Sequence, residues 1–176
     1  MGEINEPKSV LPFVGLIFID DFPVEELLRH LESNLGSCAR KSLPIPFTHT
    51  SYYNTEMGLP LVRQWVAFEE LVMPDELVDL KHLTNELEEK TLNENGGRTV
   101  NIDPGIVTLS NMILASTKNY SHRIYLGKGI YAEVTLIYKD NQFRPLEWTY
   151  PDYREDTALR FFNDAREFLK AGLKAI

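Results

Sequence analysis

The most constraining feature of the sequence is a short, nearly unbroken apolar run, FVGLIFI, from Phe13 to Ile19. A run of this length without polar alternation is typical of a strand that is covered on both faces. We therefore expect it to lie in the centre of a sheet. The chain of 176 residues has 43% hydrophobic residues, which fits one compact domain rather than two independent cores.

Local patterns predict the elements around this strand. Leucines recur at helical spacing from Pro23 to Leu35 and Gly36 follows as a stop, which predicts a helix. Aromatic and β-branched residues predict strands, and a second apolar stripe predicts another helix. These further elements are strands at Phe47–Asn54, Val62–Phe68 and Arg98–Ile102, and a helix from Pro74 that ends before Asn95-Gly96-Gly97.

The order strand, helix, strand, strand, helix, strand predicts an α+β fold with a ferredoxin-like core. We expect this core to cover about residues 12 to 102 of a single domain. The rest, about residues 103 to 176, is predicted to add a helix, a β-hairpin and a closing helix packed on the core. The added helix spans Thr108–Thr117, and the closing helix presents Phe161, Phe162 and Phe168.

The register of the hairpin follows from its apolar residues. A three-residue loop, Gly127 to Gly129, puts the apolar residues of both strands on one face, whereas a two-residue loop of Gly127-Lys128 separates them. We therefore predict the three-residue loop, with a core face formed by Ile124, Leu126, Ile130 and Val134. The predicted pairs are Leu126 with Ile130, Tyr125 with Tyr131, and Arg123 with Glu133.

Charge and cysteine content exclude several classes of function. The net charge of -8 argues against a broad nucleic-acid footprint and against an anionic membrane surface. The chain has no apolar run of about 18 residues and no signal-peptide pattern at its start, so we expect a cytoplasmic protein. A single cysteine, Cys38, excludes an internal disulfide, and together with the absence of HExxH it argues against structural zinc.

Familiar catalytic motifs are also missing from the sequence. It contains no GxxxxGK[ST] phosphate loop, no GxGxxG after a strand, no GxSxG elbow and no aspartate-rich calcium loop. The usual GTPase, dinucleotide and hydrolase interpretations therefore lack their signatures.

Basic residues are concentrated between Arg98 and Lys128, where the net charge is +3. Within this segment Asn101-Ile102-Asp103-Pro104-Gly105 is predicted to be a turn from a strand into a helix, which would offer free N–H groups to an anion. The alternative is a purely structural turn that Asp103 caps.

The candidate site is assembled around this predicted turn. In an enzyme, His122 would transfer protons, Asp103 would orient it or bind magnesium, and Lys118 would stabilise charge. No metal-ligand motif supports magnesium, so the cofactor stays open. The candidate ligand-binding residues are Arg98, Asn101, Gly105, Arg123, Lys81, Glu88 and Glu133.

Each of these candidates also has a structural interpretation. His122 could pack in a strand, Arg123 and Glu133 could form a cross-strand ion pair, and the stripe that contains Lys81 and Glu88 could be an ordinary salt-bridged surface. The segment WTYPDY from Trp148 to Tyr153 could wall a pocket or stack a base, or pack against the closing helix.

Several strings together resemble the prokaryotic family catalogued as domain of unknown function 4416. They are FTHTSYYNTEMG from Phe47, KHLTNELE from Lys81, RTVNIDPG from Arg98, STKNYSHRIYLGKGIYAEVT from Ser116 and WTYPDY from Trp148. The resemblance covers nearly the whole chain, but it implies no activity because the family has none established.

Three hypotheses for function remain. The first is a pocket for a small anionic ligand, phosphorylated or nucleotide-like, in a protein that could be an enzyme. The second is a non-enzymatic protein-interaction module whose polar strings are ion pairs and caps. The third is binding of single-stranded RNA through Tyr52, Tyr53, Tyr125, Tyr131 and Trp148, which the net charge disfavours. The sequence does not indicate an oligomeric state.

Overall fold

The computed structural model describes residues 2–175, which form a mixed α/β fold with one large antiparallel sheet. The sheet has the strand order β2-β4-β1-β5-β6-β8-β7, with β3 added to β4 and β9 added to β8. The strands are β1 Leu11–Ile19, β2 Cys38–Lys41, β3 Ile45–Pro46, β4 Leu61–Phe68, β5 Val100–Val107, β6 Asn111–Ser116, β7 Ile124–Gly127, β8 Ile130–Lys139 and β9 Gln142–Pro145. The helices are α1 Val24–Leu35, α2 Asn54–Met57, α3 Leu77–Glu89 and α4 Asp156–Ala175, with 3-10 turns at Pro74–Glu76 and Pro151–Arg154.

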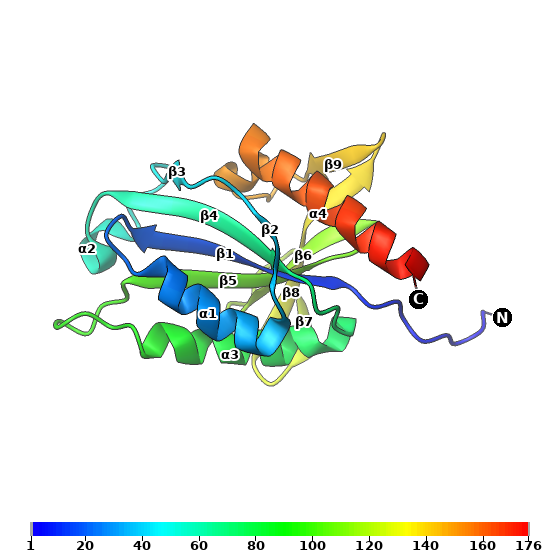
Figure 1. The fold of residues 1–176 in the computed structure, drawn as a ribbon, viewed down its shortest axis with the longest axis horizontal. Helices are drawn as coiled ribbons and strands as arrows, with labels where there is room; N and C mark the ends of the chain where they lie inside the picture. The colour runs from blue at the N-terminus through cyan, green and yellow to red at the C-terminus, as the bar shows by residue number, and fades with distance from the viewer. Residues whose placement is uncertain (1, 176) are drawn as a thin grey trace.

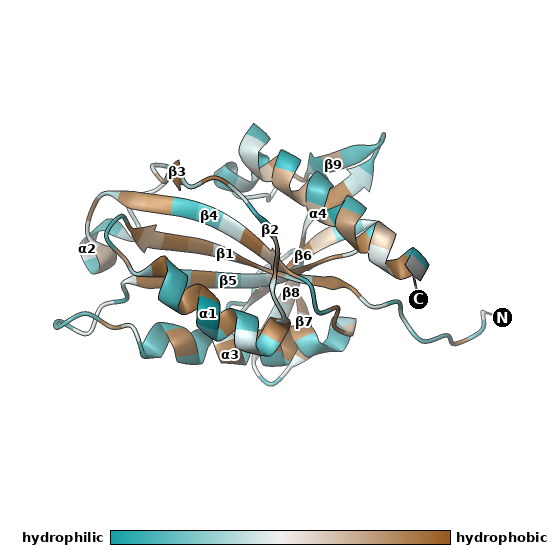
Figure 2. Ribbon diagram, in the orientation of Figure 1, coloured by the Kyte–Doolittle hydropathy of each residue, from teal (hydrophilic) through white to brown (hydrophobic). Residues whose placement is uncertain are grey.

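Strand β1 lies in the centre of the sheet, as its apolar run predicts. It pairs with β4 on one side and with β5 on the other, both antiparallel. Its side chains are buried from Leu11 to Phe18, and Figure 2 shows it as the hydrophobic middle of the sheet. Both of its faces are covered, which explains why its sequence does not alternate.

Helices cover the two faces of the sheet (Figure 1). Helices α1 and α3 pack on one face, where Leu31 and Leu87 meet Leu16 of β1 in one buried cluster. Helix α4 packs on the other face, and the ring of its Phe162 contacts Phe13 edge to face at 4.9 Å between centroids. The predicted helix from Pro23 and the predicted closing helix are therefore confirmed.

The sheet continues well beyond the four strands of the predicted core. Strands β6, β8 and β7 extend it past β5, so the molecule is not a simple ferredoxin-like fold. The prediction of a helix at 108–117 is wrong, because Thr108 instead forms a tight turn. Its hydroxyl accepts hydrogen bonds from the N–H groups of Ser110 and Asn111, and β6 follows directly.

The predicted strand at Phe47–Asn54 is also wrong. In this part of the chain the strand that pairs with β4 is limited to Ile45–Pro46, and the chain then runs as a loop into the short helix α2. The polar segment from Thr48 to Ser51 has no apolar alternation to bury against a sheet. Instead Phe47 and Tyr53 anchor the loop in a small apolar cluster with Met57.

Strand β5 runs straight through the segment that was predicted to turn. Asp103, Pro104 and Gly105 all pair with β1, opposite Gly15, Val14 and Phe13. The anion site expected at a helix start beside Asn101 to Gly105 therefore does not form, because these residues lie inside a strand. A proline is tolerated in a strand where its missing N–H would point to an unpaired edge.

Pro104 is tolerated because, within residues 2–175, no strand pairs with β5 on the side that its backbone nitrogen faces. Strand β6 pairs with β5 only at Val107, Ile106 and Gly105, and the two strands separate beyond that point. At Gly105 they approach closely, since a Cβ there would lie 2.4 Å from the carbonyl oxygen of Ile113. The role of Gly105 is thus to permit this contact, in place of the predicted ligand binding.

Helix α3 occupies the edge of β5 that β6 leaves. The N–H of Ile102 donates to Glu88 at 2.5 Å, and its carbonyl oxygen accepts from Lys81 Nζ at 3.2 Å. Two side chains on the same face of α3 therefore replace the hydrogen bonds of a neighbouring strand. Because alternate residues of a strand direct their backbone groups to the same side, Pro104 also faces this open edge.

The hairpin of β7 and β8 confirms part of the predicted register. Tyr125 pairs with Tyr131, but a bulge at Leu126 makes Gly127 the partner of Ile130. Lys128 and Gly129 alone form the turn. Ile124 and Leu126 are consequently exposed rather than in the core, because β7 is an edge strand that α4 does not cover.

Within residues 2–175, no helix has both the length and the apolar character needed to cross a membrane.

Candidate functional site

A pocket of about 420 Å³ opens on the α4 side of the sheet, where β5 and β6 separate. If the ladder continued in register, Asp103 would pair with Ser116, and both of these residues line the pocket instead. Its volume falls within the usual range of small-molecule sites, about 300 to 1,000 Å³. The lining consists of Ile17, Phe47, His49, Thr50, Tyr52, Tyr53, Arg63, Asp103, Leu114, Ala115, Ser116, Lys118, Arg123, Glu133, Tyr150, Pro151, Asp152 and Tyr153.

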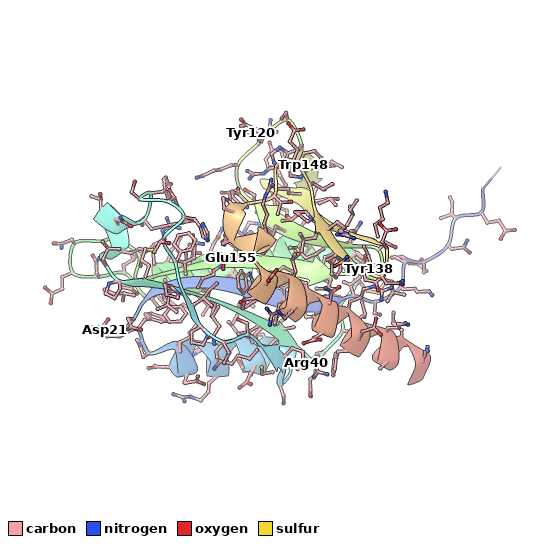
Figure 3. All side chains as sticks on the ribbon, turned by 90° about the horizontal axis from the view of Figure 1, so that it is seen from above. Asp21, Arg40, Tyr120, Tyr138, Trp148 and Glu155 are labelled. Carbon is pink, nitrogen blue, oxygen red and sulfur yellow. The ribbon has the colours of Figure 1, made fainter. Side chains whose placement is uncertain are left out.

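Two segments wall the pocket above the sheet. One is the loop from Phe47 to Tyr53, and the other is the segment from Tyr150 to Tyr153 that leads into α4. The two walls are connected where His49 Nε2 lies 2.6 Å from Glu155 Oε1. In Figure 3, Glu155 lies near the middle of the molecule at the start of α4.

Arg63 of β4 forms the floor and is only 1% exposed. Its guanidinium carbon lies 4.7 Å from the ring centroid of Tyr153 and 5.0 Å from that of Trp65. Its Nε lies 2.9 Å from Asp152 Oδ2, and its Nη1 lies 3.6 Å from Asp103 Oδ2. Burial alone would lower the pKa of this guanidinium, but Tyr153, Asp152 and Asp103 outweigh burial and raise it, so Arg63 stays charged.

Asp103 connects the floor to a polar chain along β5. Its Oδ2 accepts from Asn101 Nδ2 at 2.9 Å, and Asn101 Oδ1 accepts from Arg98 Nη1 at 2.8 Å. Arg98 then binds both carboxylate oxygens of Glu56 in α2, at 2.8 and 2.9 Å. Of the predicted residues in this chain, only Asp103 lines the pocket, whereas Arg98 and Asn101 hold it in place from behind.

Arg123 and Glu133 form the far wall. Arg123 Nε donates to Glu133 Oε2 at 2.9 Å, as the cross-strand ion-pair interpretation predicts. The other guanidinium nitrogens donate to Ser116 Oγ, the carbonyl oxygen of Lys118 and the hydroxyl of Tyr150. Because these partners engage all three of its guanidinium nitrogens, Arg123 holds the segments of this wall together.

Lys118 lines the pocket and is exposed, and its ammonium group has fewer polar contacts than the other charged groups of the lining. Its Nζ lies 5.3 Å from the ring centroid of Tyr52, a cation–π contact. Within residues 2–175 no carboxylate lies within ion-pair distance of this ammonium group, unlike the guanidinium groups of Arg63 and Arg123. Lys118 is thus the lining cation that is available to an anion.

His122, the predicted proton-transfer residue, lies outside the lining. Its ring stacks on Trp148 at 5.1 Å and meets Tyr120 edge to face at 5.2 Å. Figure 3 shows Tyr120 and Trp148 together at one end of the molecule. The Nε2 of His122 contacts Glu133 Oε2 at 3.0 Å, so it reaches the pocket only through that carboxylate.

Lys81 and Glu88 do not join the pocket lining. Both are occupied by the backbone of Ile102 at the edge of β5, as described above. Burial raises the pKa of Glu88, although Lys81 opposes this effect. Their position supports a structural role in place of the predicted contact with a ligand.

Three phenol groups remain protonated donors in the pocket. Burial is the main cause that raises the pKa values of Tyr53, Tyr150 and Tyr153, and the negative charge of Asp103 adds to it in each case. A protonated hydroxyl can both donate and accept a hydrogen bond. The pocket therefore combines aromatic faces with neutral polar groups.

Among the lining residues that sequence reasoning missed, three take part in ion pairs. Arg63 is a charged residue inside an otherwise apolar strand, LVRQWVAF, and that contrast was an available signal. Asp152 stood in the WTYPDY segment, which was considered as a pocket wall without a role for its carboxylate. His49 gave no local signal, because its partner Glu155 is 106 positions away.

The donor sets give no support to a bound metal. Within residues 2–175, no group of three or more His, Cys, Asp or Glu side chains is arranged to hold a metal ion. The carboxylates of the lining are separated among Asp103, Asp152 and Glu133, and each contacts an arginine.

The fold and the site define a mixed α/β protein with a ligand-sized pocket on the face of an antiparallel sheet. The chain belongs to the family described as Domain of unknown function (DUF4416), whose model matches residues 8–168. Comparison with curated proteins and with solved structures gave no significant match.

Proposed function

We propose that the protein binds a small phosphorylated, nucleotide-like molecule in the pocket between β5 and β6. The observation that carries this proposal is the ammonium group of Lys118, which stands at an aromatic-walled pocket without a carboxylate partner among residues 2–175. A phosphate is the natural partner for such a cation, while a planar group suits the faces of Tyr53 and Tyr150.

The charges of the lining support one anionic group rather than several. Three basic residues, Arg63, Lys118 and Arg123, face three acidic ones, Asp103, Glu133 and Asp152. Four of these six are joined in the pairs Arg63 with Asp152 and Arg123 with Glu133. A ligand with several phosphates would therefore meet too few free cations.

The wider context of the proposal follows from the sheet. We infer that the part up to β5 is a ferredoxin-like unit, because β2-β4-β1-β5 follow the order of that fold with helices α1 and α3 on one face. The later strands then add the second wall of the pocket. We also infer a cytoplasmic protein, in keeping with a soluble metabolite as the ligand.

A second function, a protein-interaction module, is favoured by one observation. Strand β7 is the free edge of the sheet and exposes Ile124, Tyr125 and Leu126 in succession. Exposed apolar edges of this kind can accept another strand. An interaction through the β7 edge would not explain why the protein has a pocket, so the small-molecule proposal ranks first.

A thermal-shift screen tests the small-molecule proposal. Nucleoside monophosphates and sugar phosphates are compared with and without magnesium. At 100 times its dissociation constant, a ligand stabilises the native state by about 2.7 kcal/mol. For a chain of this size that energy raises the melting temperature by about 5 to 11 °C.

Substitutions place any hit in the pocket. Lys118→Ala is expected to remove most of the shift, and Lys139→Ala is the control because Lys139 is exposed outside the lining. If no phosphorylated compound shifts the melting temperature, or if a hit is unaffected by Lys118→Ala, the proposal is wrong.

A further inference from the structure

The floor of the pocket contains an unusual concentration of unpaired hydrogen-bonding groups. Four buried side-chain atoms lack a hydrogen-bond partner within residues 2–175: Nε and Nη1 of Arg63, Nε1 of Trp65 and the hydroxyl oxygen of Tyr153. Arg63 and Tyr153 line the pocket. Buried polar groups in native proteins are almost always paired, so such a cluster calls for an explanation.

Within the described residues these groups have no well-aligned partner, although the Tyr153 hydroxyl and the Trp65 indole N–H are close neighbours. Arg63 Nε is held 2.9 Å from Asp152 as an ion pair without the alignment of a hydrogen bond, and Nη1 is 3.6 Å from Asp103. That carboxylate oxygen of Asp103 is already engaged by Asn101. Beneath them Gly15 leaves no side chain to contribute, because a Cβ there would lie 2.5 Å from the Tyr153 hydroxyl.

The charge of the floor determines which acceptor it suits. One guanidinium, Arg63, is flanked by the carboxylates of Asp103 and Asp152. The floor is therefore net negative, and a phosphate placed there would be repelled. A neutral oxygen with two lone pairs can instead accept from both the guanidinium and the Tyr153 hydroxyl.

Asp103 adds the complementary half of the recognition. Its side chain is 32% exposed, and it lies beside Arg63 Nη1 in the lining. A carboxylate accepts an N–H, so the floor places buried donors next to a partly exposed acceptor. The matching ligand edge is a carbonyl group adjacent to an N–H, as in the lactam or imide of a heterocycle.

We propose that the pocket binds a nucleoside monophosphate with a keto-type base, whose carbonyl oxygen meets Arg63 and Tyr153 and whose ring N–H meets Asp103. In this orientation the base lies deep in the pocket between the aromatic walls, and the phosphate lies at the entrance beside Lys118. Amino-type bases fit less well, because adenine has no carbonyl group and the carbonyl group of cytosine lies beside a ring nitrogen that carries no hydrogen for Asp103. This inference rests on the proposed function and specifies its ligand.

The test measures dissociation constants by calorimetry for a small set of probes. The probes are uridine and guanosine 5′-monophosphates, adenosine and cytidine 5′-monophosphates, the four nucleosides, and ribose 5-phosphate. At least one keto-type monophosphate is expected to bind about tenfold more tightly than both amino-type ones and than ribose 5-phosphate. This difference corresponds to about 1.4 kcal/mol.

Two conservative variants report on the floor. Asp103→Asn and Tyr153→Phe are each expected to weaken the keto-type monophosphate about three- to tenfold, the usual effect of one hydrogen bond, while ribose 5-phosphate is unaffected. Tyr153→Phe should change the melting temperature of the free protein only slightly, because its hydroxyl makes no well-aligned hydrogen bond within the described residues beyond its contact with the Trp65 indole. Lys118→Ala should weaken both phosphorylated ligands equally and leave the nucleosides unchanged.

The outcomes separate this inference from the proposed function. If ribose 5-phosphate binds as tightly as every monophosphate, or if neither floor variant changes affinity, the base assignment is overturned while the phosphate site stands. If a keto-type nucleoside binds with dependence on Asp103 and its phosphate adds nothing, the base assignment stands and the phosphate proposal fails. Absence of binding by all probes overturns both.

Discussion

The carboxylate of Glu133 is the most heavily used charge in the site wall, and its removal gives a sharp prediction. Glu133 is 2% exposed and accepts from Arg123 Nε at 2.9 Å, while His122 Nε2 lies 3.0 Å from the same oxygen. Its other oxygen contacts the Thr135 hydroxyl at 3.2 Å. Glu133→Ala therefore leaves the charge of Arg123, whose side chain is 9% exposed, without its counter-ion.

The structure sets the size of the effect. Removing one partner of a buried pair usually costs about 3 to 5 kcal/mol of stability. Arg123 would keep its hydrogen bonds to Ser116, Lys118 and Tyr150, which compensate part of the loss. We therefore expect the lower end of that range, about 3 kcal/mol, or a fall of about 6 to 12 °C in melting temperature.

Urea unfolding followed by circular dichroism measures this change as a lower midpoint with an unchanged slope. Asp79→Ala is the matched control, because Asp79 contacts Lys128 at 2.8 Å but both side chains are more than 65% exposed. A pair of that kind contributes less than about 1 kcal/mol. Equal losses from the two substitutions would show that burial of the Glu133 pair does not stabilise the fold.

Three further predictions concern packing and pH. Phe162→Ala should cost about 3 to 5 kcal/mol in urea unfolding, because Phe162 is fully buried between α4 and the sheet; an effect below about 1 kcal/mol would contradict that docking. Gly105→Ala should destabilise by about 1 to 3 kcal/mol in the same assay, since its Cβ would meet the backbone of Ile113 and the ring of Phe13; native stability would disprove the close approach of β5 and β6. The hydrogen bond from Arg98 lowers the pKa of Glu56 from its ordinary 4.5, so ionised Glu56 stabilises the native state above that pH and this contribution is lost as the pH falls through the lowered value. Glu56→Gln should therefore be less stable than the native protein at neutral pH and approach it in acid, and a gap that is constant with pH would refute the linkage.

Elements with strong local patterns were predictable from the sequence. The apolar run of β1 and the leucine spacing of α1 are properties of neighbouring residues, and both predictions were confirmed. At Pro104-Gly105 the same local reasoning failed, because Asp-Pro-Gly is common in turns. Pairing with β1 keeps this segment extended, and that contact is more than 80 positions away in the chain.

The site was predictable only in part for the same reason. Asp103, Lys118, Arg123 and Glu133 were expected near one another and all line the pocket. The floor could not be assembled from the sequence, because it joins Arg63 of β4 to Asp152 at the start of α4. His122 was selected for its chemistry, but stacking on Trp148 turns it away from the lining.

The separation of β5 and β6 means that the opening is built into the fold before any ligand arrives. Lys81 and Glu88 already bind the backbone of Ile102, and Pro104 has no N–H to donate. The hydrogen-bonded pairing of β5 and β6 therefore cannot continue past Gly105. Extension of the ladder would place Thr117 opposite Ile102, where α3 blocks it. A small molecule that bound there would meet a preformed cleft and would lose little free energy to ordering it, which would favour tight binding over a modest contact area.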